Sequence, residues 1–252
     1  MYVMKLRTFR PGKQNGRSMK RSQKPQELVS SSVLPALAVF GALYVILAAV
    51  IKRWPSTRTD VHVTRTLQSK HHPVLESFMT FVSWFGFRPQ SLLLPLSVVY
   101  AFWRSGRRLE SVLLIAAWFS SMMSFLTKQV IRRPRPDASV VRVVVAKTRD
   151  SSFPSGHVVH YVTFWGMVAY LLAFRSPWRG FRWIAGAVMA PIIALVGPSR
   201  IYLGHHWFTD VLGSYLLGTA YLSGLIEIHS RLGVNQNTEP DGWMSGASHW
   251  LR

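Results

Sequence analysis

Titratable side chains gather in the segment SRIYLGHHWFTDVLG, which covers residues 199–213. Asp210 follows His206 by four residues, so on a helix the two side chains share a face. A carboxylate there can bind one imidazole nitrogen, fix the tautomer and leave the other nitrogen free to attack. His205 has Thr209 at that spacing and points about 100° away on a helix. We therefore expect His206 to be the nucleophile and His205 to line an interface, although His–Asp pairs also occur as structural hydrogen bonds.

The segment SFPSGH at residues 152–157 has the chemistry of an anion site. Pro154 stops a preceding helix, and Ser155 is a typical N-cap or first-turn residue. A helix start presents unpaired N–H groups and partial positive charge, and Gly156 lets an anion approach the backbone. His157 lies one residue further in and can deliver a proton. Ordinary helix capping would also account for Ser155 and Gly156.

A third segment, KQVIRRPRPD at residues 128–137, is strongly basic. Arg offers a planar fork for phosphate, and Lys a point charge. For Arg132 and Arg133 we favour the simpler interpretation, in which side chains at a helix end snorkel toward water. For Lys128 and Arg135 we expect phosphate contacts.

Together these residues resemble the type 2 phosphatidic acid phosphatase family. Its pattern is a Lys, six residues, Arg-Pro; then Pro-Ser-Gly-His; then Ser-Arg, five residues, His, three residues, Asp. The eleven positions that match it with the required spacing are Lys128, Arg135, Pro136, Pro154, Ser155, Gly156, His157, Ser199, Arg200, His206 and Asp210. The helix pattern extends the resemblance over residues 75–228, and the two tails lie outside it.

The resemblance implies a role for each matched position. His206 would form a phosphohistidine, Asp210 would orient it, and His157 would protonate the leaving oxygen and then help activate water. The phosphate cradle would comprise Lys128, Arg135, Ser155, Gly156 and Arg200. The resemblance implies neither a metal ion nor another cofactor. Related soluble haloperoxidases bind vanadate with the same residues, but the membrane helices expected here argue against that activity.

The elements that must hold these residues are apolar. The chain has 252 residues, of which 49% are hydrophobic and 16% charged, a balance typical of a membrane protein. It contains no cysteine, which excludes disulfides and thiolate chemistry. The net charge of +20 is compatible with nucleic acid, anionic lipid or a phosphate substrate. Apolar runs around the basic clusters favour the last two, so we expect no nucleic-acid partner.

Six segments have the character of transmembrane helices, and we therefore predict an all-α integral membrane protein. The first of them has nineteen residues without a charge, while Arg88 and Pro89 interrupt the second. The six are Val33–Ile51, Ser91–Trp103 with an extension over Val74–Phe87, Leu109–Ile131, Ser155–Phe174, Phe181–Val196 and Trp207–Ile228. We expect this membrane domain to occupy residues 29–230, between a disordered basic tail at 1–28 and a polar tail at 231–252.

Six helices would leave both termini on one side of the membrane. The N-terminal tail carries eight basic residues, which favours a cytoplasmic location and contact with anionic lipids. Odd helices leave and even helices return through the same face, so the three motif segments would share the opposite face. We therefore expect an active site that faces the periplasm or exterior, in a bacterial inner or plasma membrane.

The function predicted from the sequence is a metal-independent membrane phosphatase acting on lipid phosphates or diphosphates. Undecaprenyl diphosphate and phosphatidate-type phospholipids are the substrates that we expect. Two alternatives stay open. A phosphotransferase would pass the phosphoryl group from His206 to another lipid, and a non-catalytic lipid-binding protein would use the site only to bind, against which the intact His–Asp pair argues.

Overall fold

The computed structural model describes residues 24–55, 57–144, 150–176 and 179–233, and this part of the chain is helical, without strands. The helices before the first motif are α1 (Lys24–Arg53), α2 (Arg58–Gln68), α3 (Pro73–Trp84), α4 (Gln90–Arg104) and α5 (Arg108–Ile131). Those after it are α6 (Gly156–His160), a π-helical turn (Tyr161–Trp165), α7 (Gly166–Arg175), α8 (Arg179–Trp183), a second π-helical turn (Ile184–Met189), α9 (Ala190–Tyr202) and α10 (Phe208–Gly233).

Five continuous helices in the described residues are long and apolar enough to cross a membrane. They are Val33–Arg53 within α1, Arg108–Ile131 (α5), Gly156–Arg175 (α6 to α7), Gly180–Tyr202 (α8 to α9) and Phe208–Leu232 within α10. Each overlaps a segment predicted from the sequence. The helix containing Phe181–Val196 continues beyond the predicted end, so Arg200 is helical. The helix α1 begins at Lys24, inside the predicted basic tail, while residues 1–23 and 234–252 lie outside the described part.

The remaining predicted span, which included residues 74–103, differs from the expectation. It forms two helices, α3 and α4, of 12 and 15 residues, instead of one of membrane length. The break falls at residues 85–89, where Pro89 lacks a backbone N–H and disfavours helical geometry in Arg88. In the described residues, five long helices and this broken pair therefore stand where six spans were predicted.

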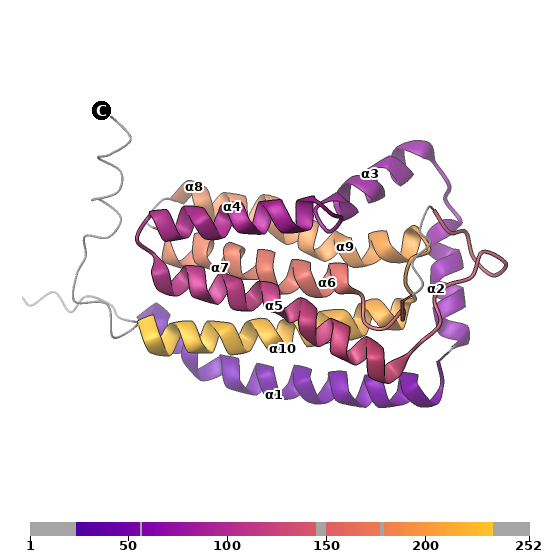
Figure 1. Ribbon diagram of the computed structural model, residues 1–252, viewed down its shortest axis with the longest axis horizontal. Helices are drawn as coiled ribbons and strands as arrows, with labels where there is room; N and C mark the ends of the chain where they lie inside the picture. The colour runs from indigo at the N-terminus through magenta and orange to yellow at the C-terminus, as the bar shows by residue number, and fades with distance from the viewer. Residues whose placement is uncertain (1–23, 56, 145–149, 177–178, 234–252) are drawn as a thin grey trace, which may run out of the picture.

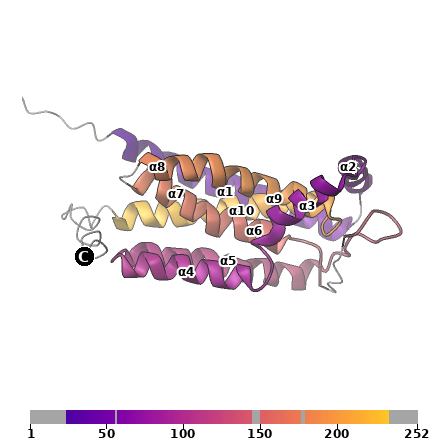
Figure 2. The same cartoon turned by 90° about the horizontal axis from the view of Figure 1, so that it is seen from above.

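The long helices pack side by side as a bundle, with α1 lying along α10 (Figure 1). The short helix α2 lies across one end of the bundle, and α3 leans away from α4 near the same end (Figures 1 and 2). A core between α5, α7 and α10 contains Leu114, Phe164, Met167 and Leu171, all fully buried, together with Leu225. Large apolar side chains such as Phe119 and Trp183 are exposed on the outside, as expected for helices that contact lipid.

Candidate active site

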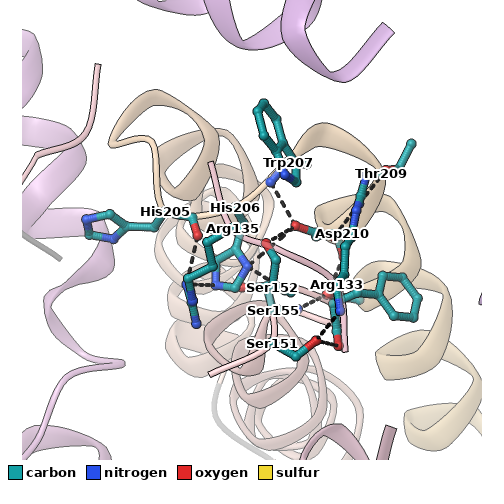
Figure 3. Close-up of polar contacts among 12 residues, drawn as sticks. Arg133, Arg135, Ser151, Ser152, Ser155, His205, His206, Trp207, Thr209 and Asp210 are labelled. Atoms are coloured by element: carbon teal, nitrogen blue, oxygen red, sulfur yellow. Dashed lines mark hydrogen bonds and ion pairs between the residues drawn. The ribbon is translucent and has the colours of Figure 1, made fainter. Parts of the chain in front are cut away.

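The three motif segments meet at the end of the bundle that α2 covers. They come from the end of α5, the start of α6 and the α9–α10 turn. Arg135 links the first segment to the third, because its guanidinium donates to the backbone oxygen of His205 (2.8 Å). Ser152 joins the second segment to both, since its backbone N–H donates to the Arg133 oxygen (2.8 Å) and its own oxygen lies 2.7 Å from His206 Nδ1. Figure 3 shows Arg135 and His206 side by side in this cluster. Residues 70 positions apart in the chain thus form one site.

His206 has the geometry of a neutral nucleophile. Its Nδ1 lies 2.7 Å from the backbone oxygen of Ser152, and since a carbonyl only accepts, Nδ1 must carry the proton. Its Nε2 then holds a lone pair, and Arg135 Nη1 lies 3.4 Å from this atom. Burial, followed by the charges of Arg135 and Arg200, lowers the pKa of His206 well below its usual range. The ring is therefore neutral at physiological pH.

Asp210 supports His206 less directly than the sequence indicated. The helix α10 begins at Phe208, so His206 precedes it and the i,i+4 helical pairing does not form. Asp210 Oδ2 is 3.8 Å from His206 Nδ1, beyond hydrogen-bond distance. The same oxygen accepts from Ser152 Oγ (2.5 Å) and from the backbone N–H of Trp207 (2.8 Å). Asp210 thus holds the residue whose carbonyl holds His206 (Figure 3).

His157 packs closely against the residues of the break between α3 and α4. A Cβ added to Gly86 would lie 2.2 Å from His157 Cδ2, so only glycine allows this approach. The rings of Phe87 and His157 pack edge to face, with their centroids 4.8 Å apart. Arg200 Cζ lies 5.4 Å from the centroid of the same Phe87 ring. The broken pair α3–α4 therefore positions two predicted site residues, His157 and Arg200.

Ser155 and Gly156 stand at the helix start, as predicted. Ser155 is the N-cap of α6, but its hydroxyl makes no capping bond; its backbone N–H donates to Ser214 Oγ at 2.7 Å. Among the described residues, three buried polar atoms of the predicted site lack a hydrogen-bond partner: Ser155 Oγ, His157 Nε2 and Arg200 Nε. Buried polar atoms without partners are rare in proteins and are typical of sites that bind a ligand.

Lys128 and Arg135 are held by one carboxylate, that of Asp150. Lys128 Nζ contacts Asp150 Oδ2, and Arg135 Nη2 lies 2.6 Å from Asp150 Oδ1. Partial burial alone would raise the pKa of Asp150, but the hydrogen bonds and charges of Lys128 and Arg135 outweigh it and lower that pKa to about 2. Lys128, Asp150 and Arg135, here termed the Asp150 bridge, therefore show that the two predicted cations can hold one anion together.

The interpretation of Arg133 as a snorkelling residue is wrong. Arg132 ends α5 in the left-handed conformation (φ 50°) and is exposed, whereas the Arg133 side chain is fully buried. Arg133 contacts Asp210 Oδ1 and lies 2.5 Å from Asp60 Oδ2 on α2. The left-handed turn at the helix end sends Arg133 inward, where two carboxylates compensate its charge.

His205 turns away from its neighbour (Figure 3). It is buried, and its Nε2 lies 2.6 Å from the backbone oxygen of Val144. Burial, followed by the charge of Arg200, lowers the pKa of His205 to about 4. The sequence predicted that His205 lines an interface. In the structure its side chain is buried and binds the backbone of Val144, which connects that segment to the α9–α10 turn.

Two grooves reach the site. One, of about 470 Å³, is lined by charged residues that include Lys128, Arg135 and Asp150. The other, of about 390 Å³, runs between α4, α5 and α6 and ends at Gly156 and His157. Its walls are largely apolar and include Leu92, Trp118, Phe119 and Met122.

Sequence reasoning missed four residues of this cluster: Ser152, Arg133, Asp150 and Asp60. Ser152 contacts His206 through its backbone oxygen, which any residue type carries, and only its hydroxyl, which donates to Asp210, depends on its identity. Asp150 is an isolated acid beside a basic segment, and that contrast was a usable sign. Asp60 has no motif around it and reaches the site only because α2 folds across the bundle end.

Comparisons with known proteins indicate the family of the chain. A family model described as the PAP2 superfamily matches residues 109–233. Phosphatidylglycerophosphatase B of Bacillus subtilis is 30% identical over 181 residues, which are 69% of this chain and 85% of that protein. The chain belongs to the PAP2 superfamily. An undecaprenyl-diphosphatase of Sulfolobus acidocaldarius is 29% identical to this PAP2 protein over 172 residues, 67% of this chain and 78% of the relative.

Two crystal structures share the fold of this PAP2 protein. A transmembrane PAP2-type phosphatidylglycerolphosphate phosphatase from Bacillus subtilis superposes with a TM-score of 0.66 at 23% identity, over 81% of this chain and 98% of that one. LpxE of Aquifex aeolicus superposes with a TM-score of 0.52 at 23% identity, over 69% of this chain and 96% of that one. With five membrane-length helices in its described residues, this PAP2 protein is an integral membrane protein.

Proposed function

We propose that this protein is a membrane phosphatase that hydrolyses lipid phosphates or diphosphates through a phosphohistidine on His206. The observation that carries the proposal is the hydrogen bond from His206 Nδ1 to the Ser152 carbonyl at 2.7 Å. It fixes the tautomer in which Nε2 has its lone pair next to Arg135. A buried neutral imidazole beside cations that attract phosphate has the requirements of a phosphoryl acceptor.

In the first step, His206 Nε2 attacks the terminal phosphorus of the substrate. The bond from phosphorus to the leaving oxygen breaks as the P–N bond forms, and His157 donates a proton to that oxygen. The His206 ring gains positive charge, which its Nδ1–H shares with the Ser152 carbonyl. The leaving group is an alcohol for a lipid monophosphate and a lipid monophosphate for a lipid diphosphate.

In the second step, water replaces the lipid at phosphorus. His157, now deprotonated, takes a proton from the water as the oxygen attacks the phosphohistidine. The P–N bond breaks, inorganic phosphate forms, and His206 returns to its neutral state. If a second lipid hydroxyl took the place of water, the same residues would carry out a phosphotransfer, so products must distinguish the two reactions.

The phosphate cradle of Lys128, Arg135, Ser155, Gly156 and Arg200 would stabilise the charge on the transferring group. Phosphate oxygens would replace the Asp150 carboxylate as the partner of Lys128 and Arg135. The unpartnered Ser155 Oγ and Arg200 Nε support this assignment, because each can donate to a phosphate oxygen. The apolar groove that ends at His157 suits a lipid chain, and it brings the leaving oxygen to the proposed acid.

Catalysis without a metal ion is part of the proposal. Cations of the cradle surround the expected phosphate, and they supply the charge that a magnesium ion provides in other phosphoryl-transfer enzymes. In the described residues no three His, Asp or Glu side chains are grouped to hold a metal. Activity should therefore survive EDTA, and vanadate should inhibit as a pentavalent mimic of the transferring phosphoryl group.

The relatives and the groove together support the proposed substrate class. The curated relatives include a phosphatidylglycerophosphatase and undecaprenyl-diphosphatases, so both lipid monophosphates and diphosphates are candidates.

We further propose that residues 29–230 form the phosphatase domain between two tails, with anionic lipids at the basic N-terminal tail. The site would face the periplasm or cell exterior of a bacterium. A cysteine at exposed Ala138, in a chain without other cysteines, would react with an impermeant thiol reagent in intact cells.

One experiment tests the central proposal. Purified protein in detergent is given undecaprenyl diphosphate, phosphatidylglycerophosphate and phosphatidate, each with and without EDTA, while free phosphate and lipid products are measured. When the terminal phosphate of the lipid substrate carries a label, rapid quenching of the reaction should trap a labelled phosphoprotein that is acid-labile and alkali-stable. Release of phosphate without that intermediate would overturn the His206 mechanism. Transfer to a lipid acceptor, or binding without turnover, would favour the two alternatives.

A further inference from the structure

Behind His206 lies a polar cluster that reaches outside the family pattern. It comprises the buried charges of Asp60, Arg133 and Asp210 together with the partly buried Thr209, and we term it the buried network. The side chains of Asp60, Arg133 and Asp210 are each at most 1% exposed. Asp60 belongs to α2 and lies outside residues 109–233, the part matched by the family model. A buried carboxylate so far from the motifs needs a physical reason, because burial of charge is costly.

Arg133 is shared between the two carboxylates. One side of its guanidinium contacts Asp210 Oδ1 and donates to Thr209 Oγ1 at 2.8 Å. The other side donates to Asp60 Oδ2 at 2.5 Å, and its Nε donates to the backbone oxygen of Pro55 at 2.7 Å. Asp60 therefore keeps the guanidinium in place for Asp210 by satisfying the donors that Asp210 does not use.

Asp60 also fixes the first turn of α10. Its Oδ1 accepts from the backbone N–H and from the hydroxyl of Thr209, both at 2.9 Å. Free N–H groups at a helix start are usually capped by a nearby residue of the same chain segment. Here the cap comes from a different helix, so the position of Asp210, one residue further along α10, depends on α2.

A continuous line of contacts thus runs from Asp60 to the proposed nucleophile. Asp60 holds Arg133 and Thr209, these hold Asp210, Asp210 accepts from Ser152 Oγ, and the Ser152 carbonyl accepts from His206 Nδ1. We propose that Asp60 is a positioning residue for this reaction, which sets the angle of the His206 ring through Arg133 and the first turn of α10. The inference rests on the proposed function, in which His206 attacks phosphorus.

The test uses the full-length protein in detergent and the variant Asp60→Asn, which keeps the shape and loses the charge. Displacing a catalytic group by about 1 Å can cost about 10²-fold in rate. We expect kcat per active site to fall by at least about tenfold while KM changes little, since the cradle that binds ground-state phosphate is untouched. Active sites are counted by the stoichiometry of vanadate binding in calorimetry, so loss of folded protein does not mimic the effect.

Two further variants keep the test decisive. Thr209→Val removes a hydroxyl without altering charge, and it should lower kcat in the same direction by a smaller factor, even if Asp60→Asn does not fold. Glu110→Gln is the control, because it removes an ion pair to Arg107 at the opposite end of α5; kcat should stay near wild type. Wild-type kcat in Thr209→Val, or equal rises in KM and falls in kcat in Asp60→Asn, would overturn the proposal.

The binding measurements separate this inference from the proposed function. Vanadate adopts the pentavalent geometry that includes a bond to the nucleophile, whereas orthophosphate reports only ground-state binding. In Asp60→Asn, vanadate affinity should fall at least about tenfold and orthophosphate affinity should stay close to wild type. If the wild type bound vanadate but released no phosphate from any lipid, the proposed function would fail alone. Equal vanadate affinity in the wild type and Asp60→Asn would contradict only the positioning role of Asp60. A wild type without turnover or vanadate binding would contradict both the proposed function and the positioning role.

Discussion

Arg133 and Arg135 are two residues apart, yet they belong to opposite kinds of electrostatic environment. Arg133 is fully buried in the buried network, where carboxylates from α2 and α10 compensate its charge. Arg135 belongs to the Asp150 bridge, in which its partner is an exposed carboxylate. The first environment is closed, with its hydrogen bonds made inside the protein, and the second has an anion partner that a ligand can replace.

This difference separates positioning from binding. A buried ion pair contributes little net stability, because desolvation offsets the attraction, but breaking it is costly and its geometry is rigid. An exposed ion pair is weak and exchanges readily. His206 lies between the two, with its Nδ1 supported through Ser152 and Asp210 and its Nε2 beside Arg135. Variants on the two sides of His206 should therefore fail in different ways.

The largest effect is expected from His206→Ala, which removes the imidazole ring that lies between the buried network and the Asp150 bridge. Turnover should be abolished, whereas orthophosphate should still bind, because the cradle is intact. His205→Ala should keep most activity, since Arg135 contacts only the backbone oxygen of that residue and the lost hydrogen bond to Val144 is worth about 1 kcal/mol. Phosphate release and calorimetry measure both. An inactive His205→Ala beside an active His206→Ala would reverse the assignment of the nucleophile.

Arg133→Met should act mainly on stability. It leaves the buried carboxylates of Asp60 and Asp210 without their cation, and breaking such a group costs about 3–5 kcal/mol. We expect a strongly lowered Tm and little folded protein. Tryptophan fluorescence during heating in detergent measures the Tm. An Arg133→Met variant with a wild-type Tm and impaired phosphate binding would place Arg133 with the binding residues instead.

Arg135→Met should show the opposite pattern. Asp150 keeps Lys128 as a partner, so Tm should change little. Loss of one donor to the developing charge typically costs about 10²–10³-fold in kcat. Comparing Tm and kcat of the two methionine variants in the same detergent measures the contrast directly, and similar profiles for both would contradict it.

The smallest effect is expected from Asp150→Asn. The side chain is 48% exposed, and exposed ion pairs are worth about 0.2–1 kcal/mol, so inhibition by inorganic phosphate should strengthen by up to about fivefold. The pKa of about 2 keeps Asp150 ionised above pH 4, so the difference between wild type and variant should be constant from pH 5 to 9. Weaker phosphate inhibition in the variant would mean that Asp150 arranges the cations and does not compete with the ligand.

Periodicity and spacing predicted much of the fold. Charge-free apolar runs identify membrane-length helices because every backbone group in a bilayer must be bonded within its own segment. The predicted span over residues 74–103 differed because its break is specified by packing as well as by Pro89: His157 occupies the space next to Gly86. No local pattern in residues 85–89 encodes that contact with α6.

The sequence by itself determined which side chains we propose for the chemistry. The spacing of Lys128, Arg135, Ser155, His157, Arg200 and His206 selected residues that the structure gathers at one end of the bundle. Such motifs are readable because phosphoryl transfer requires particular side-chain types, and the short turns that carry them are local in the chain.

Only the tertiary structure decided how those side chains are supported. It replaced the expected His206–Asp210 pairing by a link through Ser152, moved Arg133 into the interior, and brought Asp60 to the site from α2. The physical reason is that burial is a property of the packed molecule. Whether a charge is desolvated, and which opposite charge compensates it, depends on segments far apart in the chain, and neither residue type nor spacing records them.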